Sequence, residues 1–253
     1  MDKPAPFKAK AVLFVMMALT CSFALAGAAY LDMEFKLSIH AFSIAVKLAL
    51  MLTAAAYAAL RGVPMNAAGS RFFSMWLPVA LIPFVLTGLN TLRMPNRMPA
   101  ATEWIEMLLS VFTTAAWEEM FYRYVARTLF ERDGRYTPGA VVLLTLTFGS
   151  AHLINMFFYA PAAVLLQTLN ACVFGLFLLA LYRHTGSLRL VIASHFFNNL
   201  IATFFDFFAD TPYLIQSAAP FILLIVAEAA VGLFILIRYG YVARDNGERA
   251  SAI

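Results

Sequence analysis

The chain of 253 residues is strongly apolar, with 62% hydrophobic residues, 13% charged residues and a mean hydropathy of +0.79. This composition excludes a soluble globular protein and is typical of an all-α protein that crosses a lipid bilayer several times. The net charge of +4 does not indicate a nucleic-acid partner, because the basic residues are scattered through short segments and form no basic domain.

Apolar runs separated by turn residues divide the chain into about eight predicted transmembrane helices. A crossing needs about 20 residues, so the whole chain, 1–253, is expected to form a single transmembrane domain. The first run is longer than the core of a signal peptide, roughly 7–15 residues, and we expect it to be retained. The predicted spans lie near 11–30, 40–60, 72–92, 103–130, 138–158, 161–182, 187–208 and 213–237.

The distribution of basic residues predicts the orientation of these spans. When loops are assigned alternately to two sides, 14 Lys and Arg residues fall on one side and 3 on the other, with Lys47 inside the second span. The positive-inside rule then places both termini in the cytosol. The compact chain favours a multi-pass protein of the bacterial inner membrane.

Charged residues in the fourth span are the first indication of a function. The sequence Trp117–Arg123 (WEEMFYR) places two carboxylates and a guanidinium at membrane depth, where charge persists mainly beside a partner or a wet cavity. Glu119 and Arg123 share a helix face at i,i+4, with the acid before the base. This ion pair could simply pin the helix. Glu118 lies roughly 100° further round the helix and lacks such a partner, which makes it a candidate general base.

Two histidines and an asparagine lie at similar depth in later spans. Measured from the cytosolic helix ends at 1.5 Å per residue, the depths are about 18 Å for Glu118, 21 Å for His152, 12 Å for His195 and 18 Å for Asn199. Asn199 follows His195 by four residues and therefore shares its face. A single histidine in a membrane helix is usually a packing residue, but three helices converging on one level indicate a common site.

These residues fall in three short motifs. Glu118–Arg123 resembles the EExxxR motif, Phe148–His152 the FxxxH motif and His195–Asn199 the HxxxN motif of the CAAX protease and bacteriocin-processing family of intramembrane endopeptidases. The motifs occur in the family's order within a core of about 103–208. The resemblance implies hydrolysis of a peptide bond in a membrane-anchored or lipidated protein, as in removal of the last three residues of prenylated CAAX proteins.

The resemblance also implies roles for the motif residues. Glu118 and His152 would activate a water, while His195 and Asn199 would stabilise the oxyanion. Glu119 and Arg123 would hold the site electrostatically. Apolar side chains beside the motifs, Phe148 and Phe196, could contact an apolar substrate.

A zinc site is the alternative interpretation of the same residues. If zinc were bound, its ligands would be Glu118, His152 and His195, because Asn199 is a poor ligand and Glu119 is engaged by Arg123. The two histidines lie on different helices, unlike the paired ligands of an HExxH motif. Cys21 and Cys172 lie in separate apolar runs without ligand spacing. We therefore expect a mechanism without a metal cofactor.

Two other classes of function remain compatible with the sequence. One is a non-catalytic membrane protein of the same fold, such as an immunity or sorting factor. The other is a proton-coupled transporter, because intramembrane carboxylates and histidines also mark proton pathways. Intact motifs favour the protease over the first, and the absence of a visible sequence repeat favours it over the second.

Overall fold

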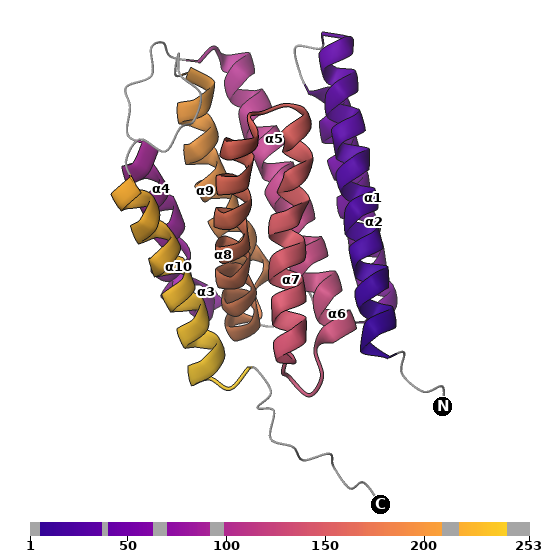
Figure 1. The fold of residues 1–253 in the computed structure, drawn as a ribbon, viewed down its shortest axis with the longest axis vertical. Coiled ribbons are helices and arrows are strands. Elements are labelled where there is room, and N and C mark those ends of the chain that lie inside the picture. Colours follow the sequence, from indigo (N-terminus) through magenta and orange to yellow (C-terminus); the bar gives the residue numbers. More distant parts are fainter. Residues whose placement is uncertain (1–5, 37–39, 63–69, 92–98, 209–217, 242–253) are drawn as a thin grey trace, which may run out of the picture.

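The computed structural model describes residues 6–36, 40–62, 70–91, 99–208 and 218–241. In these ranges the chain is an all-α bundle without strands (Figure 1). The helices are α1 (Phe7–Glu34), α2 (Ala41–Arg61), α3 (Ser70–Ala80), α4 (Ile82–Thr91), α5 (Ala101–Glu119), the π-helix η1 (Met120–Val125), α6 (Ala126–Phe130), α7 (Pro138–Ser150), the 3₁₀-helix η2 (Ala151–Phe157), α8 (Pro161–Thr185), α9 (Leu188–Phe208) and α10 (Ala218–Arg238).

Each predicted span coincides with helical structure over its described residues, so the prediction of an all-α polytopic bundle is confirmed; residues 92 and 213–217 of the predicted spans lie outside the described ranges. In the described part of the chain, five helical segments are long and apolar enough to cross a membrane, and two shorter apolar segments cover 73–89 and 188–204. The remaining segment, α5 to α6, carries the charged motif. This segment is helical from Ala101 to Phe130, long enough to cross a membrane, although its charged residues lower its mean hydropathy.

Local sequence explains where several helices begin, end or break. Pro138 occupies the first turn of α7, where no backbone N–H donor is needed, and Thr137 Oγ1 accepts from Ala140 N at 3.2 Å. Gly186 ends α8 in the left-handed conformation, with φ of 62°. The third predicted span is broken at Leu81 into α3 and α4, because Pro78 and Pro83 each lack a backbone N–H.

The segments that were assigned to the basic side meet at one end of the bundle, which lies at the bottom of Figure 1. Lys10 Nζ of α1 donates to Leu129 O at 2.9 Å. Arg183 of α8 donates to Gly134 O, and its Nε lies 3.4 Å from Glu131 Oε2. Tyr136 N donates to Tyr241 O at 2.8 Å, just beyond α10. These contacts place the start of α1, the 131–137 connection, the end of α8 and the end of α10 at the same level.

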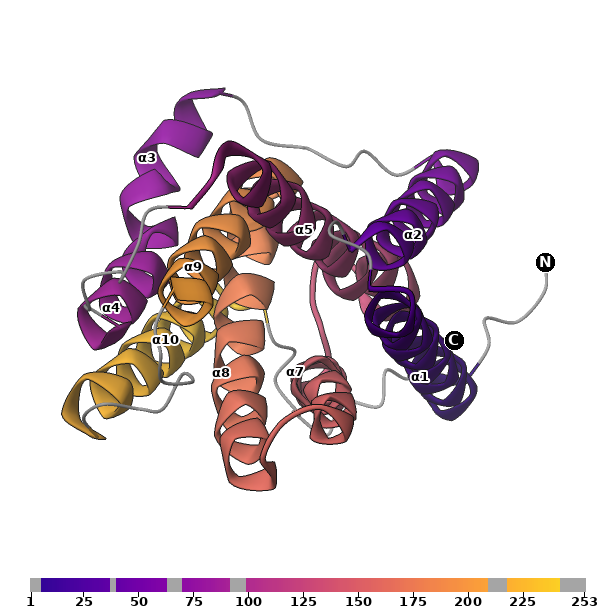
Figure 2. The same cartoon turned by 90° about the horizontal axis from the view of Figure 1, so that it is seen from above.

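Seen from above, α5 and α9 lie near the middle of the bundle (Figure 2). The pair α1 and α2 covers one side, and α3, α4 and α10 cover the other. Helix α5 packs against both α2 and α9, while α8 packs against α7 and α10. Two of the motif-bearing helices, α5 and α9, are therefore inner ones, whereas α7 lies at the edge of the bundle in this view.

Candidate active site

The charged motif lies where the α-helix changes to a π-helix. Helix α5 ends at Glu119, and the next six residues, Met120–Val125, form η1 before α6 resumes. All six are buried. π-helical turns are rare and occur frequently at functional sites, because the extra residue per turn reorients the side chains around it. No local sequence pattern predicts this change, because it depends on tertiary packing.

Glu119 connects two other motif residues. Its Oε2 lies 3.0 Å from Arg123 Nε, an ion-pair contact that lacks hydrogen-bond alignment, and its Oε1 lies 2.8 Å from His195 Nδ1. The three side chains are almost completely buried, with residue exposures of 0% for Glu119, 1% for Arg123 and 2% for His195. The predicted contact between Glu119 and Arg123 is present. The contact between Glu119 and His195 was not predicted, because it joins helices 76 residues apart in sequence.

Glu118 faces the other nitrogen of the same histidine. His195 Nε2 lies 3.8 Å from Glu118 Oε2, an oxygen that makes no hydrogen bond with any described residue. Lys47 of α2 lies within electrostatic range of Glu118, and its Nζ is 3.3 Å from Ser110 Oγ. Glu118 therefore has an acceptor oxygen without a hydrogen bond beside an imidazole, while Glu119 is held between Arg123 at 3.0 Å and His195 at 2.8 Å.

Helix α9 is fixed from its opposite side. Ser194 Oγ donates to Ala80 O at 2.5 Å, and Thr87 Oγ1 donates to Asn198 Oδ1 at 2.7 Å. Because Ser194 and Asn198 precede His195 and Asn199 by one residue each, these bonds to α3 and α4 orient the face that carries the HxxxN motif. Asn199 itself is half-buried, and its Oδ1 lies 3.5 Å from Asn198 Nδ2.

The structure places His152 on η2, just beyond the end of α7. Its Nδ1 lies 3.2 Å from Phe148 O. A carbonyl oxygen can only accept, so Nδ1 carries the proton in this bond and Nε2 of a neutral ring is an acceptor. The predicted helix 138–158 therefore ends as a 3₁₀ turn at the histidine.

The Phe148 ring packs against three side chains of the site. Its centroid lies 5.7 Å from that of His152, 6.0 Å from that of His195 and 4.7 Å from Arg123 Cζ. The ring is 1% exposed, so it packs beneath the site instead of facing an open cavity. The sequence had suggested a substrate contact for this residue. Phe196, the other suggested contact, is half-buried and lies 6.2 Å from the Phe112 ring.

Comparison with known families bears on these motifs directly. The family model described as type II CAAX prenyl endopeptidase Rce1-like matches residues 100–201. We call this matched stretch the Rce1-like core. It contains all three motifs, so the family predicted from the motifs is confirmed over these residues. No curated protein and no solved structure matched the chain.

The Rce1-like family is a family of proteases, and the match supports an endopeptidase. Within the Rce1-like core, the structure brings Glu118, Glu119, Arg123 and His195 into one cluster, with Asn199 one turn along α9. His152 joins this cluster through the Phe148 ring. The catalytic roles of these residues stay predictions, as does the substrate.

The alternative zinc ligands do not form a ready metal site. In the part of the chain that the structure describes, no three His, Cys, Asp or Glu side chains are placed to hold a metal ion. Glu118 Oε2 lies 3.8 Å from His195 Nε2, and His152 holds its Nδ1 against the Phe148 carbonyl oxygen, which leaves its Nε2 as an acceptor. The mechanism without a metal cofactor stays a prediction.

Proposed function

We propose that this protein is an intramembrane endopeptidase in which Glu118 activates water to hydrolyse a peptide bond of a membrane-anchored or lipidated protein. The observation that carries the proposal is the asymmetry of the two glutamates. Glu119 contacts Arg123 and His195, whereas Glu118 Oε2 has no hydrogen bond among the described residues and lies 3.8 Å from His195 Nε2. A free carboxylate beside an oriented imidazole suits general-base chemistry.

The first chemical step forms a bond between the water oxygen and the scissile carbonyl carbon, while Glu118 takes the water proton. His152 assists this step, because its Nδ1 is held by Phe148 O and its Nε2 remains an acceptor. The carbonyl oxygen becomes an oxyanion. When the tetrahedral intermediate collapses, the C–N bond breaks and Glu118 returns the proton to the leaving amine.

The oxyanion is stabilised by Asn199 and His195. Asn199 supplies an amide N–H donor in either charge state of the site. His195 can donate from Nε2 only as an imidazolium, because Glu119 already accepts from Nδ1. The buried Glu119 carboxylate holds the imidazole through Nδ1, in the same way that a buried carboxylate orients the histidine of a serine protease. Arg123 in turn holds Glu119 in place.

The proposal places the protein in a bacterial inner membrane with both termini in the cytosol. Its substrate enters the site from the membrane, and a prenylated CAAX peptide or a C-terminal transmembrane segment meets this requirement. The buried site and the Rce1-like core support such a substrate class.

A peptide panel tests the proposal. Purified protein is incubated with lipidated peptides and with C-terminal membrane segments, and the products are identified by mass spectrometry. We expect at least one peptide to be cut at a single bond by the wild-type protein and to stay intact with Glu118→Gln. If no member of a broad panel is cut, or if Glu118→Gln yields the same product at the same rate, the proposal is wrong.

A further inference from the structure

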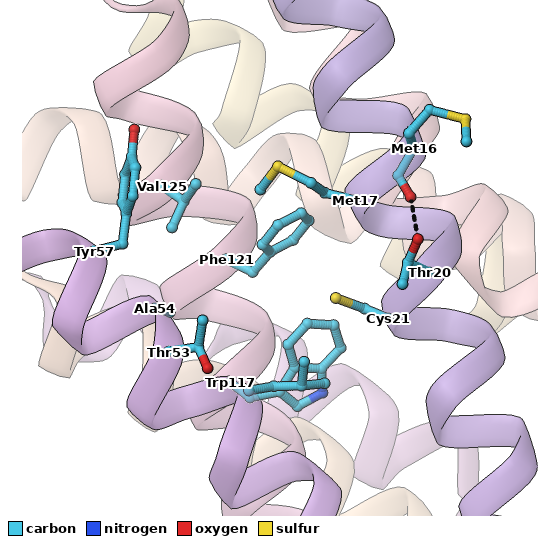
Figure 3. Close-up of a pocket in the computed structure, with 11 residues that line it drawn as sticks. Met16, Met17, Thr20, Cys21, Thr53, Ala54, Tyr57, Trp117, Phe121 and Val125 are labelled. Atoms are coloured by element: carbon cyan, nitrogen blue, oxygen red, sulfur yellow. Dashed lines mark hydrogen bonds between the residues drawn. The ribbon is translucent and has the colours of Figure 1, made fainter.

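A groove of about 360 Å³ lies between α1, α2 and the helix that carries Glu118 (Figure 3). Side chains of α1 form one wall and side chains of α2 the other, while residues of α5 and η1 form the floor. The lining residues are Met16, Met17, Thr20, Cys21, Leu50, Thr53, Ala54, Tyr57, Trp117, Phe121 and Val125. None of them belongs to the proposed catalytic groups.

The groove offers almost nothing to a polar ligand. Thr20 Oγ1 donates to Met16 O at 2.9 Å, and Thr53 Oγ1 donates to Ala49 O at 2.8 Å, so both hydroxyls are engaged by their own helices. Tyr57 OH lies 3.0 Å from Thr128 Oγ1. The other lining groups are hydrocarbon, thioether, thiol and the indole of Trp117, whose Nε1 is the one buried polar side-chain atom of the lining without a hydrogen bond to a described residue. A hydrocarbon chain is the ligand that such a lining stabilises.

The groove opens sideways, toward the interior of the bilayer. Met16 is 57% exposed, and Thr20 and Thr53 are also exposed, so the rim lies on the outer surface of α1 and α2. The floor is buried, with exposures of 3% for Trp117 and 5% for Phe121. Both α1 and α2 are long and apolar enough to span a membrane. The opening therefore meets lipid tails.

We propose that this groove binds one acyl chain of a bilayer phospholipid. Its volume is at the small end of ligand pockets, roughly 300–1,000 Å³, which suits a single chain and not a whole lipid. Two flexible methionines in the wall let it adapt to chains of different shape. This binding does not depend on the proposed proteolysis.

A chain bound in the groove would contact η1, which is also part of the candidate active site. Phe121 in the floor belongs to the π-helix that also contains Arg123, and Trp117 directly precedes Glu118. A chain packed on these two rings fills space beside the helix segment that places both glutamates. The groove therefore lies directly against the backbone segment that carries the EExxxR motif.

Trp117 provides a reporter of the bound chain. In a Trp76→Phe, Trp104→Phe protein, Trp117 is the remaining tryptophan. The protein is reconstituted in nanodiscs of phosphatidylcholine with or without bromine on its acyl chains, because bromine quenches indole fluorescence at close range. We expect strong quenching of Trp117 although its side chain is buried. Ala54→Phe fills the groove from α2 and should reduce the quenched fraction by about half or more.

Leu52→Phe is the matched control, because Leu52 lies on the same helix, is 65% exposed and does not line the groove. It should leave quenching unchanged. If Ala54→Phe does not fold, Ala54→Val provides a milder filling. Absence of quenching, or equal quenching in the Ala54 and Leu52 variants, would overturn the proposal. Relief of quenching by an S-farnesylated peptide would also overturn it, because the groove would then hold the chain of a substrate.

Discussion

Glu118 and Glu119 are adjacent in sequence and have opposite surroundings. Glu119 is completely buried between Arg123 and His195, whereas Glu118 keeps a free oxygen near His195 Nε2. Glu119 is suited to hold charge in place, and Glu118 is suited to exchange a proton. The two variants should therefore affect stability differently.

Replacement of Glu119 by Gln should lower thermal stability. The variant leaves the Arg123 guanidinium buried without its counter-charge, and removal of one partner of a buried pair typically costs about 3–5 kcal/mol. The melting temperature of the detergent-purified protein measures the effect. Glu34→Gln is the control, because Glu34 is an exposed carboxylate on α1. An unchanged melting temperature for Glu119→Gln would contradict the role assigned to this residue.

Metal removal should leave activity intact. The mechanism uses Glu118 and His152 on water directly, so protein washed with a chelator and freed of zinc should cut its peptide at the original rate. Metal content and turnover are measured on the same sample. Stoichiometric zinc whose removal abolishes turnover, and whose return restores it, would instead make Glu118, His152 and His195 ligands.

The residue types of the site could be predicted from sequence, but their connections could not. Spacing of four residues predicted the contact between Glu119 and Arg123, because both lie on one helix. The bond from Glu119 to His195 depends on how α5 packs against α9, and no local pattern encodes that packing. Burial of Phe148 beneath the site was missed for the same reason.

At the scale of elements, α7 and α8 must approach closely to place Phe148 and His152. A Cβ atom on Gly149 would lie 2.9 Å from both Cys172 N and Thr168 O of α8 and would clash with the Cys172 side chain. Glycine at this position is therefore required by the neighbouring backbone. The contact sets the distance between the two helices.

Gly149→Ala should destabilise the protein by about 1–3 kcal/mol, because the new methyl group forces the α7 and α8 backbones apart. It should also lower activity by displacing His152. Gly139→Ala is the control on the same helix, since its nearest neighbour would be Phe7 Cζ at 3.8 Å. This control should be neutral or slightly stabilising. Equal melting temperatures for the two variants would show that the close approach is unimportant.

Helix positions could be predicted well because apolar length and turn residues are local signals. Thr137 with Pro138, and Gly186, mark boundaries that the structure retains. The break at Leu81, the π-helix at Met120–Val125 and the 3₁₀ turn at His152 were not predicted. The last two depend on packing between helices, whereas the prolines at 78 and 83 were visible in the sequence.

The basic segments of the chain meet at one connected end of the bundle. Lys10, Arg183 and Tyr136 each bond to a backbone carbonyl of another segment there, which ties α1, the 131–137 connection, α8 and the end of α10 together. This arrangement agrees with the alternating charge count. The positive-inside rule predicts that this end faces the cytosol.

Cysteine labelling in intact cells tests the orientation. In a background without Cys21 and Cys172, Arg135→Cys should resist a membrane-impermeant maleimide and react only after the cells are opened, because Arg135 is exposed at the basic end. Tyr159→Cys is the matched probe at the opposite end, where Tyr159 is 64% exposed, and it should react in intact cells. The reverse pattern would invert the topology.

The role of Glu118 as general base is tested by the turnover of Glu118→Gln on a peptide that the wild-type protein cuts, measured beside its melting temperature. We predict that turnover falls by about 10²–10⁴-fold, the range expected when a general base is removed. The melting temperature should stay close to that of the wild type, because Glu118 Oε2 has no hydrogen bond to lose among the described residues. A folded Glu118→Gln protein that retains wild-type turnover would contradict the account.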